Sequence, residues 1–507
     1  MNTSVVWFKR DLRLHDHQPL ALACAQGPVV CLYIVEPSLW QQPDSSTQHY
    51  QFIVESLQPL QREVERRGGV FLVQMGEATE VLQALHQQIA FTHLFSHQET
   101  GNAHTFARDK AVMAWCRTRQ VQWTELPQFG VVRALHNRND WQPAWEAFMA
   151  QPLTPAPQRI TPPPTWAPQP KQLPSTRQLG LTQPDKPHRQ RGGRALGEAV
   201  LRSFIEQRAQ HYRGGISSPL TAPNACSRVS PYLAYGCLSL REVVHTTRTA
   251  LQTPSPHATR LKQGLNAFMS RLYWHCHFIQ KLESQPDIEW RNLHRGYDNL
   301  REPNFNMAHF QALQAGRTGW PMVDACVAML RDTGWINFRM RAMLVSVAAY
   351  PLWLHWRPVG LWLAQEFLDY EPGIHWSQHQ MQAGTTGINT TRVYNPIKQA
   401  QDHDPHGHWV RQWLPHMRQV PDSWVFEPWL HPQASALGIP MPLVDLAPAT
   451  RSAKQRVHQL RAQPDIKAAK AAIVERHGSR KNTALKTTAS KRSSATTPQQ
   501  LDLGFEP

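Results

Sequence analysis

Charged residues interrupt apolar helical sequence in the second half of the chain. Arg339 and Arg341 lie within GWINFRMRAML, and Asp369 and Glu371 follow the apolar run LHWRPVGLWLAQEF. A buried charge costs several kcal/mol unless it is paired or receives a polar ligand. An arginine–carboxylate pair beside a bound polar cofactor would explain both features, and Asn337, one helical turn before Arg341, can face the same ligand.

A hydroxyl-rich segment, CSRVSPY, begins at Cys226. Small hydroxyl residues just before a helix can hydrogen-bond an anion, while the helix amino terminus attracts its charge. An ordinary helix-capping sequence would look the same, so the segment alone does not separate the two interpretations.

Short apolar runs that alternate with helical stretches must position these groups. The runs at residues 5–7, 29–35, 70–73 and 92–96 predict a parallel α/β domain over residues 1–130. No GxGxxG motif occurs, so a dinucleotide site in this domain is not supported.

The rest of the chain divides by composition. Residues 131–194 are predicted to be an interdomain linker, largely extended, because eleven prolines fall within residues 151–190. Trp and Phe at helical spacings predict an all-helical domain over residues 195–446. Residues 447–507 form a basic, largely disordered tail, although residues 447–474 have the composition of a helix.

The net charge of +16 indicates a polyanionic partner. Residues 451–492 hold twelve Lys and Arg but two acidic residues, so much of this charge lies in the tail. A solvated tail that raises solubility is the alternative to attraction for nucleic acid.

The seven cysteines are scattered and lack CxxC spacing, as expected of reduced thiols. No run of about 18 apolar residues and no signal-peptide pattern occurs, which predicts a cytoplasmic protein without a membrane partner.

Five segments, in order along about the first 440 residues, resemble the DNA photolyase/cryptochrome family. They are VVWFKRDLRLHDHQPLALA, NACSRVSPYLAYGCLSLREV, GLNAFMSRLYWHCHFIQ, the stretch from GWINFRMRAML to YNPIKQ, and HGHWVRQWLP. The resemblance implies an α/β amino-terminal antenna domain with a Rossmann-like parallel sheet, followed by an all-helical FAD-binding domain.

The resemblance also implies which residues hold FAD. Arg341 and Asp369 match a salt bridge beside the isoalloxazine ring, although a buried ion pair that only fixes helix register is the alternative. His375 matches the residue that faces flavin N5, where many photolyases have asparagine, and it is a catalytic candidate. The implied cofactor-binding residues are Tyr212, Ser227, Arg228, Val229, Ser230, Asn337, Arg341, Asp369, Tyr370, Glu371 and His375.

UV-damaged DNA is the implied substrate. Trp274 and Trp335 match aromatic walls of a lesion cavity, where flipped-out bases stack. The residues expected to contact DNA are Arg271, Trp274, His275 and Arg339. However, Arg271 stands where cyclobutane-dimer photolyases have glutamate, and the histidines of (6-4) photolyases would fall at Phe338 and Ala342, so the lesion type stays open.

The family's tryptophan chain to the flavin is incomplete in this sequence. Trp356 matches its middle member and is a catalytic candidate, but His379 and Pro303 replace the outer two. Light-driven reduction would need another route, for which Trp376 is a candidate, or would be inefficient.

The antenna chromophore, folate or deazaflavin, is also unresolved, since His104 and Thr105 stand where folate-binding members have Asn-Glu. Three functions remain. The first is a light-dependent photolyase that repairs pyrimidine dimers by electron transfer from reduced FAD. The second is a cryptochrome-like blue-light receptor, and the third is a flavin-binding scaffold without photochemistry.

The chain ends in QQLDLGFEP. Its residues Gln500, Leu501, Leu503 and Phe505 resemble the short peptide by which bacterial repair proteins dock on the sliding clamp. Three large apolar side chains at the end of a polar tail have no core to join, so a pocket on a partner is a reasonable use for them. The alternatives are that the terminus folds back onto its own domain or that the match arises by chance.

Overall fold

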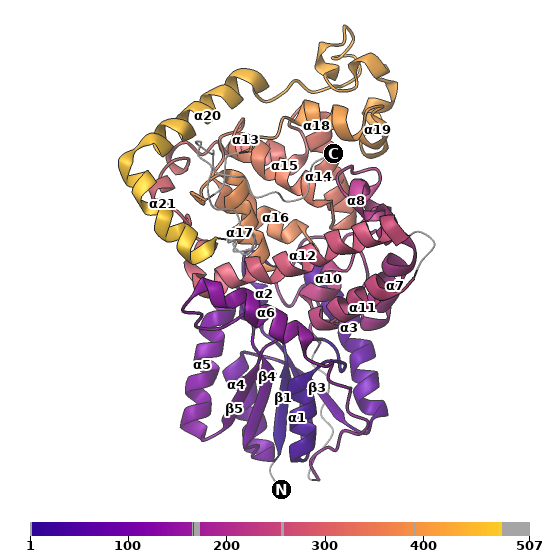
Figure 1. Ribbon diagram of the computed structural model, residues 1–507, viewed down its shortest axis with the longest axis vertical. Helices are drawn as coiled ribbons and strands as arrows, with labels where there is room; N and C mark the ends of the chain where they lie inside the picture. Colours follow the sequence, from indigo (N-terminus) through magenta and orange to yellow (C-terminus); the bar gives the residue numbers. More distant parts are fainter. Residues whose placement is uncertain (1–2, 165, 167–172, 255–257, 389–391, 479–507) are drawn as a thin grey trace, which may run out of the picture.

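A five-stranded parallel sheet lies at the amino-terminal end of the molecule (Figure 1). The computed structural model describes residues 3–164, 166, 173–254, 258–388 and 392–478. The strand order is β3-β2-β1-β4-β5, with β1 (Ser4–Phe8), β2 (Val29–Val35), β3 (Val70–Met75), β4 (His93–His97) and β5 (Gln122–Leu126). This sheet confirms the predicted Rossmann-like α/β region. The sequence prediction missed β5, a partly exposed edge strand whose QWTEL sequence has no apolar run.

Helices cover both faces of the sheet, so the strands are apolar on both sides. Alternate residues of β1 point to opposite faces: Val5 and Trp7 join one core cluster, and Val6 and Phe8 join another. The first cluster contains residues of α4 (Ala78–Ile89) and α5 (Ala103–Arg119), and the second contains residues of α1 (Gln18–Gln26) and α3 (Thr47–Arg66).

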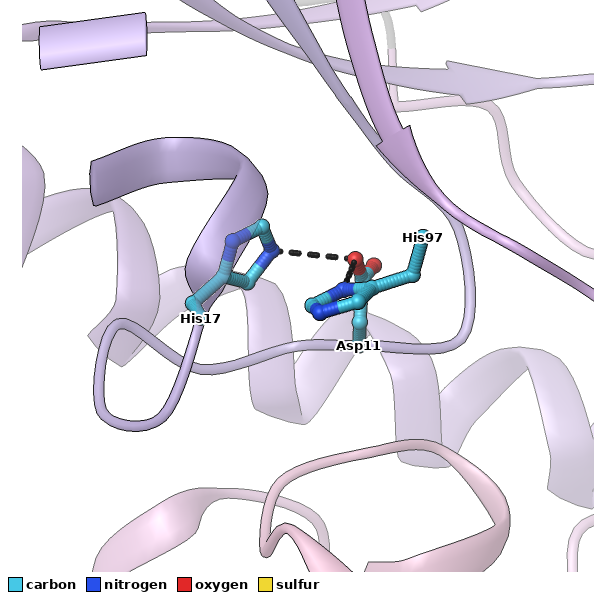
Figure 2. A group of neighbouring side chains, drawn as sticks. All are labelled: Asp11, His17 and His97. Carbon is cyan, nitrogen blue, oxygen red and sulfur yellow. Dashed lines mark hydrogen bonds and ion pairs between the residues drawn. The ribbon is translucent and has the colours of Figure 1, made fainter. Parts of the chain in front are cut away.

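A buried Asp11–His17–His97 cluster follows β1 (Figure 2). Asp11 Oδ2 lies 2.9 Å from His17 Nε2 and 2.7 Å from His97 Nδ1, close enough for a shared metal ion. However, His17 Nδ1 accepts the Leu20 N–H at 3.1 Å. Burial lowers the pKa of both histidines, so His17 is neutral and its one ring proton must be on Nε2, facing Asp11. We therefore interpret the cluster as hydrogen bonding that fixes the start of α1.

The linker is more ordered than its proline content predicted. Residues 141–150 form the helix α6 (Trp141–Ala150), whose Trp141 and Trp145 are buried. Farther along, Ile160 and Leu179 are fully buried in the same core cluster as β1. Apolar side chains between the prolines thus hold the segment against the α/β region.

The second region is helical, which confirms the other half of the predicted fold (Figure 1). No strand follows β5 in the described part of the chain. The α-helices here are α7 (Arg194–Ser203), α8 (Tyr212–Gly215), α9 (Ala222–Ala225), α10 (Ser230–Ala234), α11 (Leu240–Gln252), α12 (Ala258–Ser284), α13 (Met307–Ala315), α14 (Pro321–Thr333), α15 (Phe338–Ala349), α16 (Trp356–Glu366), α17 (Pro372–Ala383), α18 (Pro396–His403) and α19 (His408–Trp413).

The start of the basic tail is helical, over the stretch whose composition is that of a helix, and the part expected to be disordered lies outside the described residues. Helices α20 (Leu446–Ala462) and α21 (Pro464–His477) run along one flank of the helical region, in gold in Figure 1. Arg461 donates to the Tyr297 hydroxyl at 2.9 Å, and His477 Nε2 lies 2.8 Å from Gln285 Oε1. The clamp-like peptide at residues 500–505 lies outside the described residues. None of the described helices is both long and apolar enough to span a membrane.

The end of α21 closes over a group of buried basic side chains. Arg138, His277, Lys281 and His477 are each at most 8% exposed. Within the part of the chain that the structure describes, Lys281 has no ion pair. Burial, and secondly the charge of Arg138, lower the pKa of Lys281 from 10.5 to about 7.

We expect Lys281→Met to stabilise the protein at pH 7 by about 2–4 kcal/mol, because the buried amine no longer has to lose its proton or its water. The unfolded chain holds this proton up to about pH 10.5 and the folded chain only up to about 7. The gain should therefore be greatest at or below pH 7 and shrink as the pH rises toward 10. Urea unfolding of both proteins across this range measures it.

Lys262→Met, at an exposed position on the same helix, is the control and should change stability little at any pH. An equal effect of the two substitutions would show that Lys281 is not strained by burial.

Candidate functional site

A cavity of about 280 Å³ lies inside the helical region. Its walls come from α8, the segment before α10, α12, the start of α15, and α17. Twelve residues predicted from the sequence line it: Tyr212, Ser227, Arg228, Val229, Ser230, Arg271, Trp274, His275, Trp335, Asn337, Arg341 and Asp369. Segments up to about 160 residues apart in the sequence thus meet at one site.

One face of α12 forms the aromatic wall of this main cavity. Phe268, Arg271, Trp274 or His275, and Phe278 follow one another at intervals of three or four residues, the spacing of a single helix face. Trp274 and Phe278 stack with ring centroids 5.6 Å apart. The wall therefore combines aromatic rings with one cationic side chain, Arg271.

Arg341 and Asp369 form a two-pronged ion pair at the cavity. Arg341 Nη1 and Nη2 donate to Asp369 Oδ1 and Oδ2 at 2.9 and 3.0 Å, and its Nε donates to the Ile336 carbonyl at 2.9 Å. Burial alone would raise the pKa of Asp369, but Arg341 holds it below its ordinary value. The pair presents a fixed dipole to whatever occupies the cavity.

Arg228 lines the main cavity without an ion-pair partner among the described residues. Its backbone φ is 61°, in the left-handed region, and its guanidinium lies 3.9 Å over the Trp335 ring. Gln190 Oε1 accepts from its Nε at 3.2 Å, but no described carboxylate pairs with it. Burial lowers the pKa of Arg228 to about 10, so an anion in the cavity would relieve this strain. Arg228 also covers one face of Trp335, which leaves the other face for any stacking role.

A smaller cavity of about 70 Å³ shares Arg341 and Asp369 with the first and is also lined by Tyr370, Glu371 and His375. Burial raises the pKa of Glu371 to about 7, although Arg10 Nη2 lies 3.5 Å from its carboxylate. The cofactor residues predicted from the resemblance therefore line two adjoining cavities.

His375 is neutral, because burial and the neighbouring His379 hold its pKa well below 6.5. Its Nε2 lies 2.8 Å from the Gly360 carbonyl and so carries the proton, which leaves Nδ1 as a hydrogen-bond acceptor. The His379 ring lies 3.9 Å away, centroid to centroid, and its Nδ1 donates to the His375 carbonyl.

Two predicted residues, Trp356 and Arg339, line neither cavity. Trp356 is buried and donates to Asn292 Oδ1 at 2.7 Å. His275 does line the main cavity, but burial lowers its pKa to about 4, so it has no charge for a phosphate at neutral pH. Arg271 forms a side-chain hydrogen bond with Tyr212.

Sequence reasoning missed Phe268, Phe278, Gln378 and Arg10. The three- or four-residue spacing from Trp274 could have indicated Phe268 and Phe278. Nothing in the sequence indicated Arg10, which donates to the carbonyls of Ala234 and Tyr370 at 2.7 Å and so ties the α/β region to the cavity walls.

A third cavity lies at the carboxyl edge of the sheet, where open α/β folds bind ligands. Its volume is about 90 Å³, a third of the main cavity. Arg108 occupies this edge: it pairs with Glu36 and Glu99 at 2.9 and 2.7 Å and lies 4.9 Å over the Trp7 ring. These side chains therefore line the position at which a second chromophore would be expected.

Removing Arg341 from the ion pair at the main cavity should lower both the stability of the protein and its FAD content. We expect Arg341→Ala to lose about 3–5 kcal/mol of unfolding free energy, because Asp369 stays buried without its partner. The variant should also purify with less FAD, measured by absorbance after denaturation. Arg341→Met with Asp369→Asn removes both charges and should recover most of the stability but not the FAD. An Arg341→Ala protein with wild-type stability and wild-type FAD content would contradict this placement of the pair.

Comparison with known proteins agrees with this architecture. Residues 4–140 match the family model for DNA photolyase, and residues 268–459 match the model for the FAD-binding domain of DNA photolyase. The cryptochrome DASH of Gloeobacter violaceus is 28% identical, covering 88% of this chain and 93% of the relative. The deoxyribodipyrimidine photo-lyase of Escherichia coli is 27% identical, covering 88% and 96%.

Solved structures share the fold. A Synechocystis cryptochrome superposes with a TM-score of 0.79 at 22% identity, over 90% of this chain and 99% of that one. A class III photolyase from Agrobacterium tumefaciens gives 0.78 at 23% identity, over 91% and 98%. A Sulfolobus tokodaii photolyase with two FAD molecules gives 0.74 at 23% identity, over 90% and 100%. With two family models that together match most of its length and relatives aligned over 88% of it, the chain belongs to the DNA photolyase and cryptochrome family.

Proposed function

We propose that the protein is a light-dependent DNA photolyase that repairs UV-induced pyrimidine dimers with FAD. The observation that carries the proposal is the main cavity, where a half-buried Arg228 without an ion pair among the described residues and the Arg341–Asp369 pair face an aromatic wall. The cations suit an anionic, phosphate-bearing cofactor. When bound, FAD would supply a photoexcitable electron donor.

The protein's own residues would hold and orient this cofactor. Arg228 and Ser227 offer a guanidinium and a hydroxyl to its phosphates, and Arg341 with Asp369 offers a donor and an acceptor to its ring system. The side chain of Ser230 hydrogen-bonds Asp369 and so would help to position this pair. His375 offers an acceptor nitrogen from the smaller cavity, because its proton points to Gly360. Each of these assignments rests on cavity placement together with the family resemblance.

The same cavity could receive flipped-out bases. Trp274 and Phe278 give a stacking surface worth about 1–3 kcal/mol per base. Arg271 can donate to a pyrimidine carbonyl or to a phosphate, but it has no acceptor for an N–H edge. We therefore assign damaged DNA as the substrate, recognised along this wall through stacking and through the donors of Arg271.

A cryptochrome-like blue-light receptor is the second candidate, favoured by a line of aromatic rings that leads to the smaller cavity. His375 and Trp376 have ring centroids 4.9 Å apart, and Trp376 and Trp356 have theirs 5.8 Å apart. These rings could carry an electron toward FAD in place of the family's incomplete tryptophan chain. Electron transfer along these rings would photoreduce FAD in a receptor, or return FAD to its reduced form in a repair enzyme.

Two expectations about partners and location stay predictions. The tail beyond residue 478 could add nonspecific attraction to DNA, and its Gln500, Leu503 and Phe505 could dock on a bacterial sliding clamp. A cytoplasmic location follows from the sequence pattern alone.

The repair function is tested with oligonucleotides that carry either a cyclobutane dimer or a (6-4) lesion. The protein with reduced FAD should restore intact bases under blue light and not in the dark, on one of the two lesions. Arg271→Ala should raise KM roughly tenfold or more by removing a charged hydrogen bond. Lys262→Ala, exposed on the same helix, is the control. Repair of neither lesion, on single or double strands, would favour the receptor.

The electron route is tested by Trp376→Phe. We expect light-driven reduction of bound FAD, followed as loss of the oxidised-flavin absorbance, to slow several-fold while FAD content stays unchanged. Trp362→Phe changes a buried tryptophan in a different core cluster and should leave the rate unaltered. Equal rates in all three proteins would exclude Trp376 from the route.

A further inference from the structure

An open hollow of about 600 Å³ lies on the outer side of the segment that walls the main cavity. It is formed by α8, α9 and the start of α12, and none of its lining residues is acidic. The residues are Gln210, His211, Arg213, Gly215, Leu220, Thr221, Asn224, Ala225, Arg260 and Gln263. Neither the photolyase chemistry nor the FAD-binding residues use this hollow.

Two exposed arginines, Arg213 and Arg260, line the hollow. Arg213 and Arg260 have no ion pair among the described residues. Amide side chains accompany them at Gln210, Asn224 and Gln263. Guanidinium and amide donors without a carboxylate are the combination that binds phosphate and sugar oxygens of nucleic acids.

A kink in α8 places neighbouring residues on opposite sides of the wall. Tyr212 lines the main cavity, but Arg213 has an extended ψ of 120° and Gly214 a φ of 96°, so the chain turns and Arg213 lines the outer hollow. A Cβ at Gly215 would lie 2.6 Å from the Ala225 side chain, so this turn packs closely on α9. The cavity and the hollow therefore share one thin wall.

The loop at residues 216–218 borders the main cavity. Ile216 lines that cavity, and the carbonyls of Ile216 and Ser217 accept from Asn337 Nδ2 at 3.0 and 2.8 Å. Ser218 Oγ donates to the His403 carbonyl at 2.6 Å, and the charge of Arg339 contributes to lowering the pKa of His403. Gly215 and Leu220, which flank this loop, line the outer hollow, so the loop lies between the main cavity and the hollow.

We propose that the hollow is a phosphate subsite that holds the backbone of a single nucleic-acid strand as it leaves the main cavity. Arg213 and Arg260 bind the phosphates, and the amides position the sugar–phosphate chain. A strand whose bases enter the main cavity must carry its backbone across the rim, and the hollow adjoins this rim at Gly215 and Leu220 without an acidic lining residue. The inference rests on the proposed nucleic-acid substrate but not on photochemistry.

Binding in the dark tests it. Full-length protein with FAD is titrated with a labelled, undamaged oligothymidylate of about 12 nucleotides at several salt concentrations. Arg213→Gln with Arg260→Gln should weaken binding roughly tenfold near 0.1 M salt and reduce the slope of log K against log salt by about 1.4. FAD content and thermal midpoint should match the wild type, since both side chains are exposed.

Arg62→Gln with Arg119→Gln is the matched control, because it removes the same charge from exposed positions of the α/β region. Arg260→Lys keeps a cation and should retain most of the affinity if phosphate is bound there. A double variant with the wild-type slope, or one no weaker than the control, would overturn the proposal. So would weakened binding of inorganic phosphate with oligonucleotide binding intact. Failure of light-dependent repair would leave this dark measurement unaffected, so the two proposals fail separately.

Discussion

Arg341 and Asp369 form an ion pair that lines both cavities of the helical region. A buried carboxylate is tolerated only when its charge is compensated, and Arg341 does this through two hydrogen bonds while a third anchors it to the Ile336 carbonyl. The pair fixes the start of α15 against the loop before α17. Both cavities of the helical region use it as a shared wall, so their shape depends on this one interaction.

The contact between the two regions depends on a second arginine. Arg10, just after β1, donates to the carbonyls of Ala234 and Tyr370 and lies near Glu371. On the other side of the sheet edge, Asp16 accepts hydrogen bonds from Ser239 and Arg241. These hydrogen bonds connect the α/β region to the segments that line the cavities. The α/β region therefore helps to fix the positions of the cavity walls.

Charge is distributed unequally between the regions. In the α/β region Arg108 is surrounded by Glu36, Glu99 and Asp109, so its charge is neutralised internally. In the helical region Arg228 and the arginines of the outer hollow have no such described partners. Uncompensated cations inside and beside one cavity are what a phosphate-bearing cofactor and a polyanionic strand both require.

The sequence by itself determined the order and type of the elements and the chemistry of the main cavity. Alternating apolar runs indicated the parallel sheet, and charged residues inside apolar helices indicated a buried ion pair, because both patterns follow from local burial. It did not indicate β5, the packing of α20 and α21, or the linker's contacts, since these depend on neighbours distant in the chain. Only the tertiary structure decided that Trp356 and Arg339 lie off the cavities, that Arg228 covers Trp335, and that Tyr212 and Arg213 face opposite ways. Those outcomes depend on the direction of each side chain and on kinks in the backbone, which residue spacing does not fix.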